Sequence, residues 1–136
     1  MKAQAVNPIL NVSSMEESFA WFEKLGWQKS WSWGDPVEFA AVISDKVEIF
    51  LCLNCQGTRS TTKPRHPFDG ETGGTWLSLW VSSPKEVDEV HALAVKNEIE
   101  VTFPPNDMPW SVREFHVRHP DGHTFRIGAG LPETEE

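Results

Sequence analysis

Apolar residues recur every third or fourth position in residues 14–25 and again in residues 84–96, a spacing that places them on one face of a helix. The apolar stripes consist of Met15, Phe19, Phe22 and Leu25 in the first stretch and of Val87, Val90 and Ala94 in the second. Gly26 and Asn97 follow the two stretches, and both residue types commonly end helices. We therefore predict two helices, each with one buried stripe.

An apolar strand leads into each helix, and three strand-like runs follow it. These runs are Trp27–Trp33, Val37–Ile43 and Val47–Leu53 in the first half, and Glu100–Phe103, Val112–Arg118 and Thr124–Gly128 in the second. The pattern predicts an α+β fold in which a βαβββ unit occurs twice, over about residues 6–53 and 76–129. With 136 residues, 39% of them hydrophobic, the chain has room for one core and one domain.

A short repeated segment supports the duplication. The sequence LNVSS at residues 10–14 returns as LWVSS at residues 79–83, each time between an apolar strand and a helix. Ser13 and Ser83 each stand three residues before a glutamate, which is the spacing of a capping box. We expect these two serines to cap the two helices.

Residues 54–75 are rich in Gly, Pro, Thr and Ser and show no periodicity, so they predict a long loop between the halves. Loops of this length are uncommon unless they serve a site or a subunit contact. Pro104 and Pro105 mark a second irregular stretch, and the acidic residues 133–136 predict a frayed tail.

Alternation along the expected strands separates two faces of the sheet. One face is mostly aliphatic, and we place it under the helices. The opposite face mixes polar groups with large aromatic ones, namely Asn7, Asn11, Glu48, Trp76, Ser78, Trp80 and Arg126. Flat apolar area beside a few directional groups is what a ligand cleft requires, whereas the alternative is the solvated face of an antiparallel sheet. Tryptophans on this face favour the cleft.

Composition narrows the kind of partner. Seven tryptophans and no tyrosine leave flat indole surface for a ligand after the core is covered. The net charge of −8, from 20 acidic and 12 basic residues without a basic block, argues against nucleic acid and anionic membranes and favours a cationic or neutral partner. No apolar run has the length of a signal peptide or a membrane span, so we expect a cytoplasmic protein.

Neither the two cysteines nor any common enzyme motif points to a catalytic function. Cys52 and Cys55 form a C-x2-C without the second pair that a zinc site needs, and we expect reduced thiols packed at the end of a strand. The sequence contains no Gly-x-Ser-x-Gly, phosphate-binding loop or dinucleotide fingerprint. Serine-hydrolase and nucleotide-dependent chemistry are therefore excluded.

Three histidines offer a rival metal site. His116, His119 and His123 have the spacing H-x2-H-x3-H across the expected closing hairpin. The Pro-Asp-Gly sequence between the last two is typical of a turn. We rank a metal site here below a structural role.

Two segments resemble a known superfamily. Residues 8–27, PILNVSSMEESFAWFEKLGW, resemble the opening strand and helix of the vicinal-oxygen-chelate (glyoxalase and bleomycin-resistance) superfamily. Arg113-Glu114-Phe115 and the following HPDGH at residues 119–123 resemble its closing hairpin, which usually reads Asp-Pro-Asp-Gly. The resemblance implies that the two units form a cup-shaped mixed sheet. It also implies a homodimer, because the cup closes when units pair and a single unit leaves an open sheet edge.

The resemblance places the metal ligands of this superfamily at Asn7, Glu48, Trp76 and Arg126. Of these side chains only Glu48 is a good ligand, because an indole cannot coordinate and a guanidinium is a permanent cation. We expect Glu48 and Arg126 to form an ion pair instead, which lowers the pKa of Glu48 and makes it a poor general acid. The expected protein therefore has no metal and no other cofactor, like the bleomycin-resistance branch.

The leading hypothesis is a metal-free protein that binds, and so sequesters, a small cationic or aromatic compound such as an antibiotic. Its expected ligand-binding residues are Asn7, Trp31, Trp33, Glu48, Phe50, Trp76, Trp80, Trp110 and Arg126. The alternatives are a metal-dependent lyase, isomerase or dioxygenase with altered ligands, and a non-catalytic interaction module.

Overall fold

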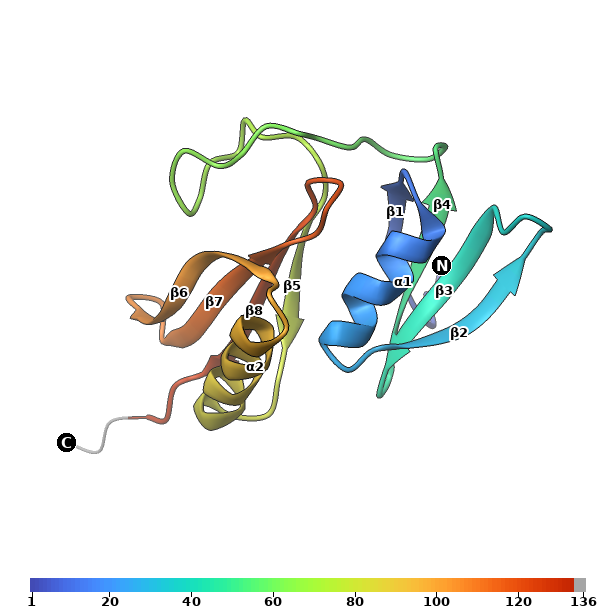
Figure 1. The fold of residues 1–136 in the computed structure, drawn as a ribbon. Coiled ribbons are helices and arrows are strands. Elements are labelled where there is room, and N and C mark those ends of the chain that lie inside the picture. The colour runs from blue at the N-terminus through green and yellow to red at the C-terminus, as the bar shows by residue number, and fades with distance from the viewer. Residues whose placement is uncertain (134–136) are drawn as a thin grey trace.

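The chain folds into two four-stranded sheets, each accompanied by one helix (Figure 1). The computed structural model describes residues 1–133, so most of the expected acidic tail, from residue 134 on, lies outside the described residues. The first half contains β1 (Ile9–Val12), α1 (Met15–Lys24), β2 (Gln28–Trp33), β3 (Phe39–Ser44) and β4 (Val47–Leu53). The second half contains β5 (Trp76–Trp80), α2 (Pro84–Lys96), β6 (Glu100–Met108), β7 (Val112–Arg118) and β8 (Thr124–Gly130).

The two sheets have the same topology. Their strand orders are β1-β4-β3-β2 and β5-β8-β7-β6. In each sheet the first strand pairs in parallel with the last, and the remaining pairs are antiparallel. This arrangement confirms the α+β class and the repeated βαβββ unit that the sequence predicts.

Strand β6 is longer than expected. It continues to Met108 through Pro104 and Pro105, where the sequence predicts an irregular stretch. The pairing of β6 with β7 shifts register between Phe103 and Asn106, so the two prolines lie at an irregularity of the ladder. An edge strand with such an irregularity tolerates proline, because the missing N–H is not needed there.

The cap of α1 differs from the expected one. Ser14 caps this helix and accepts a hydrogen bond of 3.1 Å from the backbone N–H of Glu17. Ser13 instead donates through its backbone N–H and its hydroxyl to the Asp121 carboxylate, in the turn between β7 and β8. Ser13, the serine with the spacing of a capping box, therefore makes a contact with the second half of the chain instead of capping the helix. Ser83 caps α2 as expected.

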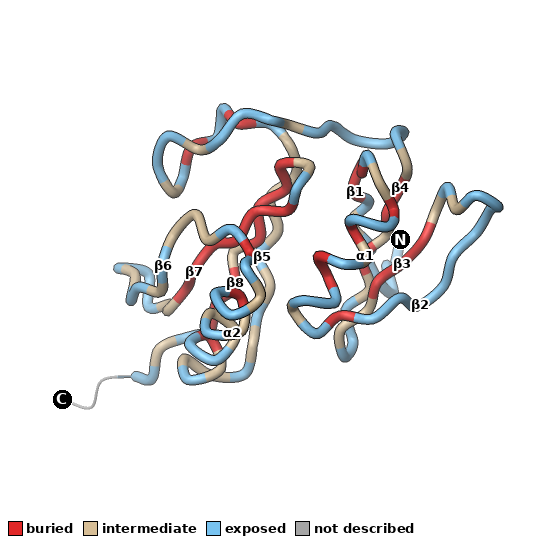
Figure 2. Tube along the Cα trace, in the orientation of Figure 1, coloured by how far each residue is buried: buried red, intermediate tan, exposed pale blue. Residues whose placement is uncertain are grey.

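The core lies on the helix side of both sheets, and the two halves meet in it. Helix α1 lies between the sheets in Figure 1, and the buried segments in Figure 2 lie along the central strands and the helix sides that face them. Trp21 and Phe22 of α1 contact Phe125 of β8, with ring centroids 5.2 and 5.8 Å apart. Most apolar positions of the face under the helices are buried as the alternation predicts, namely Leu10, Val12, Ile49, Leu51, Phe125 and Ile127. Val47 is exposed instead, and Leu77, Leu79 and Val81 are only partly buried.

Two of the three spaced histidines join the halves rather than forming a metal site. His119 Nε2 lies 2.9 Å from the Ser18 hydroxyl of α1, and its Nδ1 accepts from the backbone N–H of Asp121. His123 Nε2 lies 2.7 Å from the backbone oxygen of Asn11 in β1. Burial lowers the pKa of His119 to about 3 and also lowers the pKa of His123, so both rings are neutral at pH 7. Within residues 1–133 no cluster of three metal-binding side chains is found.

The two cysteines are bonded to each other, which corrects the expectation of reduced thiols. Asn54 adopts the left-handed conformation, with φ 52°, directly after β4. The chain turns there and brings the Cα atoms of Cys52 and Cys55 to 5.7 Å, and the two sulfurs form a disulfide. Period-two alternation cannot foresee this contact, because it depends on the turn after the strand.

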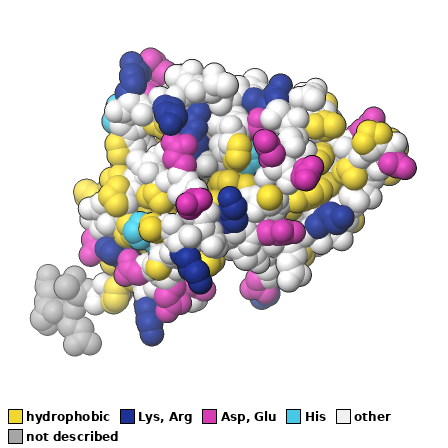
Figure 3. Space-filling model, viewed as in Figure 1, with side chains coloured by type: hydrophobic (Ala, Val, Ile, Leu, Met, Phe, Trp, Pro, Cys, Tyr) yellow, Lys and Arg dark blue, Asp and Glu magenta, His cyan; other side chains and the backbone are white. Residues whose placement is uncertain are grey.

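Charge is spread over the surface. Acidic and basic side chains are interspersed on the face of the molecule that Figure 3 shows, so the net charge of −8 is not gathered into one patch on that face. In the described part of the chain, neither helix has the length and apolarity needed to cross a membrane.

Candidate functional site

The second-half sheet carries a buried carboxylate on the face away from the core. Glu114 of β7 is 2% exposed and accepts two hydrogen bonds from Arg126 of β8, through Nε at 2.8 Å and a terminal nitrogen at 2.9 Å. Trp110 Nε1 donates to the same carboxylate at 2.9 Å, and His116 Nε2 lies 2.8 Å from it. Four contacts therefore satisfy this buried group.

The protonation of this cluster follows from its contacts. Burial alone would raise the pKa of Glu114, but the hydrogen bonds from Arg126, His116 and Trp110 outweigh it, and the pKa lies below its ordinary value. Burial lowers the pKa of His116, although the neighbouring Glu114 opposes the shift. The cluster therefore holds an ionised carboxylate, a guanidinium and a neutral imidazole at pH 7.

The prediction of an ion pair between Glu48 and Arg126 is wrong. Arg126 pairs with Glu114, which is not among the expected site residues. The sequence shows only that Glu114 and His116 are two residues apart and so share a face of β7; the structure adds that His116 is the direct partner of Arg126 across the ladder. Recognising the pair requires the register of β7 against β8.

The connecting loop covers part of this face. Phe68, from residues 54–75, has its ring 5.4 Å from the guanidinium carbon of Arg126 and packs edge-on against Trp110 and His116. Arg65 holds the loop in shape by donating to Asp69, and these hydrogen bonds keep the pKa of that carboxyl well below its usual range. Phe68 lies in an aperiodic segment, so no pattern in the sequence marks it as part of the site.

Beyond Phe68 a cavity of about 260 Å³ remains open on the same face. Trp80 and Trp110 stand beside it with 65% and 49% of their surface exposed, and Ser78, Glu114 and Arg126 contribute its polar groups. Trp76 lies deeper, half-buried, with its ring edge-on to His116. The structure thus brings Trp76, Trp80, Trp110 and Arg126 together on one sheet.

The first-half sheet carries a separate aromatic cluster. Trp31 of β2 stacks on Phe39 of β3, and Phe50 of β4 meets both rings edge-on, with centroids 5.3 to 5.7 Å apart. Glu48 accepts a hydrogen bond of 2.9 Å from the Ser30 hydroxyl and a longer one of 3.4 Å from Trp31 Nε1. We call Trp31, Phe39, Phe50 and Glu48 the first-half cluster. A flat apolar surface and one carboxylate lie next to each other there.

Asn7 and Trp33 lie at the margins of this cluster. Asn7 donates through its side-chain amide to the backbone oxygen of Glu48 at 2.9 Å, and Trp33 is 65% exposed. Within the described residues, the side chains of Glu48 and Arg126 share no hydrogen-bond partner: Glu48 bonds to Ser30 and Trp31, and Arg126 to Glu114. The expected site residues therefore fall into two groups, one on each sheet of the chain.

Comparison with known proteins identifies the family. The family model of the Glyoxalase/Bleomycin resistance protein/Dioxygenase superfamily matches residues 4–127. The chain belongs to this superfamily. No sequence among the curated proteins matches significantly.

Several solved structures share the fold at low sequence identity. A bleomycin-binding protein complexed with bleomycin is 12% identical with a TM-score of 0.67, and the alignment covers 96% of this chain and all of that one (100%). Lactoylglutathione lyase from Agrobacterium tumefaciens is 17% identical with a TM-score of 0.71, covering 96% of both chains. A genomically encoded fosfomycin resistance protein from Listeria monocytogenes is 15% identical with a TM-score of 0.69, also covering 96% of both. These likenesses show the fold alone.

The strand registers refine the metal-ligand positions that the resemblance implies. Phe50 pairs with Ile9 in β1, and Arg126 pairs with Ser78 in β5. Ile9 and Ser78 are equivalent, because each immediately precedes the repeated segment. Phe50 is therefore the first-half counterpart of Arg126, and the register moves this ligand position from Glu48 to Phe50.

The residues at these positions do not suit a divalent metal ion. Asn7, Phe50, Trp76 and Arg126 include an indole and a phenyl ring, which cannot coordinate, and a guanidinium, which repels a cation. The amide nitrogen of Asn7 is engaged with the backbone of Glu48. No step of metal chemistry can be built on this donor set.

Proposed function

We propose that this protein binds a small, flat, cationic or aromatic organic molecule without a metal ion, and that it acts by holding this compound rather than by converting it. The observation that carries the proposal is the first-half cluster, where three aromatic rings contact one another beside Glu48. Aromatic faces attract cations through their quadrupole, and a neighbouring carboxylate adds charge attraction. The net charge of −8 favours the same class of ligand.

The second-half sheet supports binding over catalysis. Its carboxylate, Glu114, is ionised and fully occupied by Arg126, Trp110 and His116, so it has no proton to donate and no free lone pair directed at a ligand. Trp80 and Trp110 leave exposed indole surface beside the small cavity. Stacking on these rings needs no acid or base.

We further propose that the working unit is a homodimer. The two groups of site residues lie on different sheets of one chain, and Trp31, Trp33, Trp80 and Trp110 are all exposed. A second copy that sets its first-half sheet against the second-half sheet of the first would cover these tryptophans and combine Glu48 with Trp76, Trp80 and Arg126 in one groove. A symmetric dimer would contain two such grooves.

The likeness to a bleomycin-binding protein supports the choice of ligand class. That protein was solved in complex with bleomycin, and the present chain shares its fold over nearly the whole length. We carry over the class of compound and not the compound, so the proposed activity is the sequestration of a flat organic molecule such as an antibiotic.

Ethidium, a flat aromatic cation, is a suitable probe, with phenanthridine as its uncharged parent ring. Ethidium should bind more tightly than phenanthridine. Trp31→Leu should weaken ethidium binding by roughly twofold to thirtyfold, the range of a cation–aromatic contact of about 0.5–2 kcal/mol. Glu48→Gln should weaken it by about twofold to fivefold, since the carboxylate is only partly buried.

Glu23→Gln provides the matched control, because Glu23 is exposed on α1 and lies outside both groups of site residues. This variant should bind ethidium as the unmodified protein does. Equal affinity for ethidium and phenanthridine, or equal losses in Glu48→Gln and Glu23→Gln, would refute cation recognition by the first-half cluster.

A further inference from the structure

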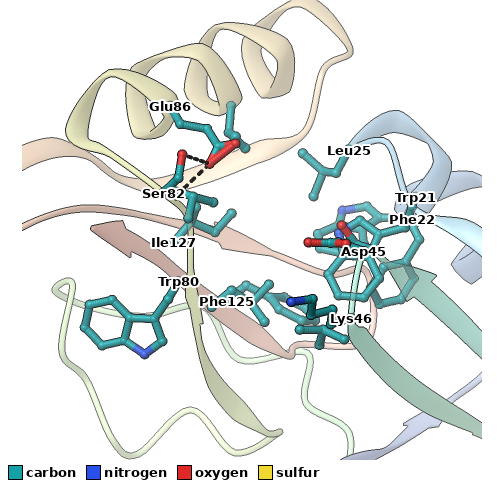
Figure 4. A pocket seen from close by; sticks show the side chains of 16 residues that line it. Trp21, Phe22, Leu25, Asp45, Lys46, Trp80, Ser82, Glu86, Phe125 and Ile127 are labelled. Carbon is teal, nitrogen blue, oxygen red and sulfur yellow. Dashed lines mark hydrogen bonds between the residues drawn. The ribbon is translucent and has the colours of Figure 1, made fainter. Parts of the chain in front are cut away.

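A larger cavity lies between the two halves, on the helix side of the sheets, and shares only Leu79 and Trp80 with the smaller cavity described above. Its volume is about 590 Å³, within the range of roughly 300–1,000 Å³ that small-molecule sites occupy. The end of α1, the turn between β3 and β4, the end of β5 and one side of α2 surround it (Figure 4). None of the expected ligand-binding residues except Trp80 borders this space.

The walls of the cavity are apolar. Trp21 and Phe22 from α1 pack against Phe125 from β8 and form one buried wall, so both halves of the chain contribute (Figure 4). Leu25, Leu79, Val81 and Val90 also line it and are only partly buried. These side chains offer contacts that the protein itself does not complete, and an apolar body of modest size would complete them.

The polar groups of the cavity differ in how well they are satisfied. Glu86 accepts hydrogen bonds from the backbone N–H and the hydroxyl of Ser82, at 2.8 and 3.3 Å, and lies in the first turn of α2, where a negative charge is stabilised. Asp45 and Lys46 form the tight turn between β3 and β4 on the opposite side. Within residues 1–133 neither of them forms an ion pair.

Figure 4 shows how the two turn residues stand toward the cavity. The Lys46 ammonium extends toward Phe125, and the Asp45 carboxylate lies on the side of Leu25. One rim of an apolar cavity therefore presents a cation and an anion from adjacent residues. A ligand with a single charge would be attracted by one of them and repelled by the other, whereas a compact zwitterion can pair with both.

We propose that this cavity is a second ligand site, independent of the proposed function, and that it binds an α-amino acid with an apolar side chain. The side chain lies against the partly buried Leu25, Leu79 and Val90, the carboxylate pairs with Lys46, and the ammonium group pairs with Asp45. Because the walls come from both halves, the ligand stabilises their contact.

The test compares L-phenylalanine with two analogues that each lack one charged group, 3-phenylpropionate without the amine and phenethylamine without the carboxylate. Calorimetry and the fluorescence of Trp21 and the other tryptophans should show saturable binding of phenylalanine at millimolar concentrations or below. Each analogue should bind about twofold to fivefold more weakly, the effect of one partly exposed ion pair.

Two surface variants separate the charges. Lys46→Gln should remove the preference for phenylalanine over phenethylamine, and Asp45→Asn should remove the preference over 3-phenylpropionate. Asparagine tolerates the left-handed conformation of residue 45, with φ 49°, so both variants should fold. Val90→Phe, which fills the cavity from α2, should abolish binding.

Glu48→Gln serves as the control for the other site and should leave phenylalanine binding unchanged. Absence of saturable binding by phenylalanine in the unmodified protein would overturn the proposal. Equal affinity for phenylalanine and both analogues would overturn the zwitterion assignment, and a loss of phenylalanine binding in Glu48→Gln would place the ligand on the first-half cluster instead. Ethidium binding tests the proposed function separately.

Discussion

Replacing Glu114 by glutamine should destabilise the protein and reveal that this carboxylate has a structural role. The substitution keeps the volume of the side chain and removes its charge. It leaves the Arg126 guanidinium without a counterion in a partly buried place, and it removes one of the acceptors of Trp110 and His116. The sheet face itself is otherwise unchanged.

The magnitude follows from the burial of the two partners. Removing one member of a fully buried ion pair costs about 3–5 kcal/mol, because the other charge stays behind without a partner. Glu114 is 2% exposed, but the Arg126 side chain is 32% exposed, so water can solvate part of the remaining charge. We therefore expect a loss of about 2 kcal/mol in the free energy of unfolding, or a fall of roughly 6–10 °C in Tm for a domain of this size.

Urea denaturation of Glu114→Gln, Arg126→Gln and the double variant measures the effect and its origin. The double variant should lose less than the sum of the two single variants by about 1–3 kcal/mol, because it contains no unpaired charge. Glu23→Gln, on the exposed side of α1, should change stability by less than about 0.5 kcal/mol. If Glu114→Gln were as stable as Glu23→Gln, or if the two site substitutions were additive, the pairing of Glu114 with Arg126 would be refuted.

Three further predictions concern pH, the tryptophans and assembly. His119 has a folded pKa of about 3, below its value in the unfolded chain, so stability should be full above about pH 6.5 and fall by up to about 1.4 kcal/mol per pH unit toward pH 3. A His119→Asn variant should show a flatter pH profile in thermal melts, and an unchanged profile would contradict the assignment. Trp80→Ala should cost little stability yet weaken ethidium binding, because Trp80 is 65% exposed; a large loss of Tm with unchanged affinity would show that it packs in a core. Sedimentation should find a dimer, and Trp33→Glu should shift it toward monomer, whereas a 15.4 kDa species at micromolar concentration would count against the dimer.

The repeated unit and the buried faces could be predicted from the sequence, because both depend on local periodicity. The apolar stripe of α1 and the alternation in β1 and β4 require only the geometry of single elements. Leu10, Ile49 and Phe125 are buried as this alternation predicts.

The partners of the site residues could not be predicted in this way. Glu48 and Phe50 point to the same face of β4, so alternation cannot decide which of them is the counterpart of Arg126; the ladder register decides it. The bond between Glu114 and Arg126 depends likewise on the register of two strands. Phe68 belongs to a loop, where no periodic signal exists, and reaches the sheet through the path of the whole connection.

The most direct test of metal-free binding is a pair of ethidium titrations on one preparation of the dialysed protein, first with chelator and then with zinc, manganese, nickel or iron(II) in excess. The donor set of Asn7, Phe50, Trp76 and Arg126 predicts the same ethidium affinity in both titrations. After the unbound metal is removed by dialysis, elemental analysis should find less than one metal ion per chain. One bound metal ion per chain, together with ethidium binding that appears only in its presence, would contradict the account.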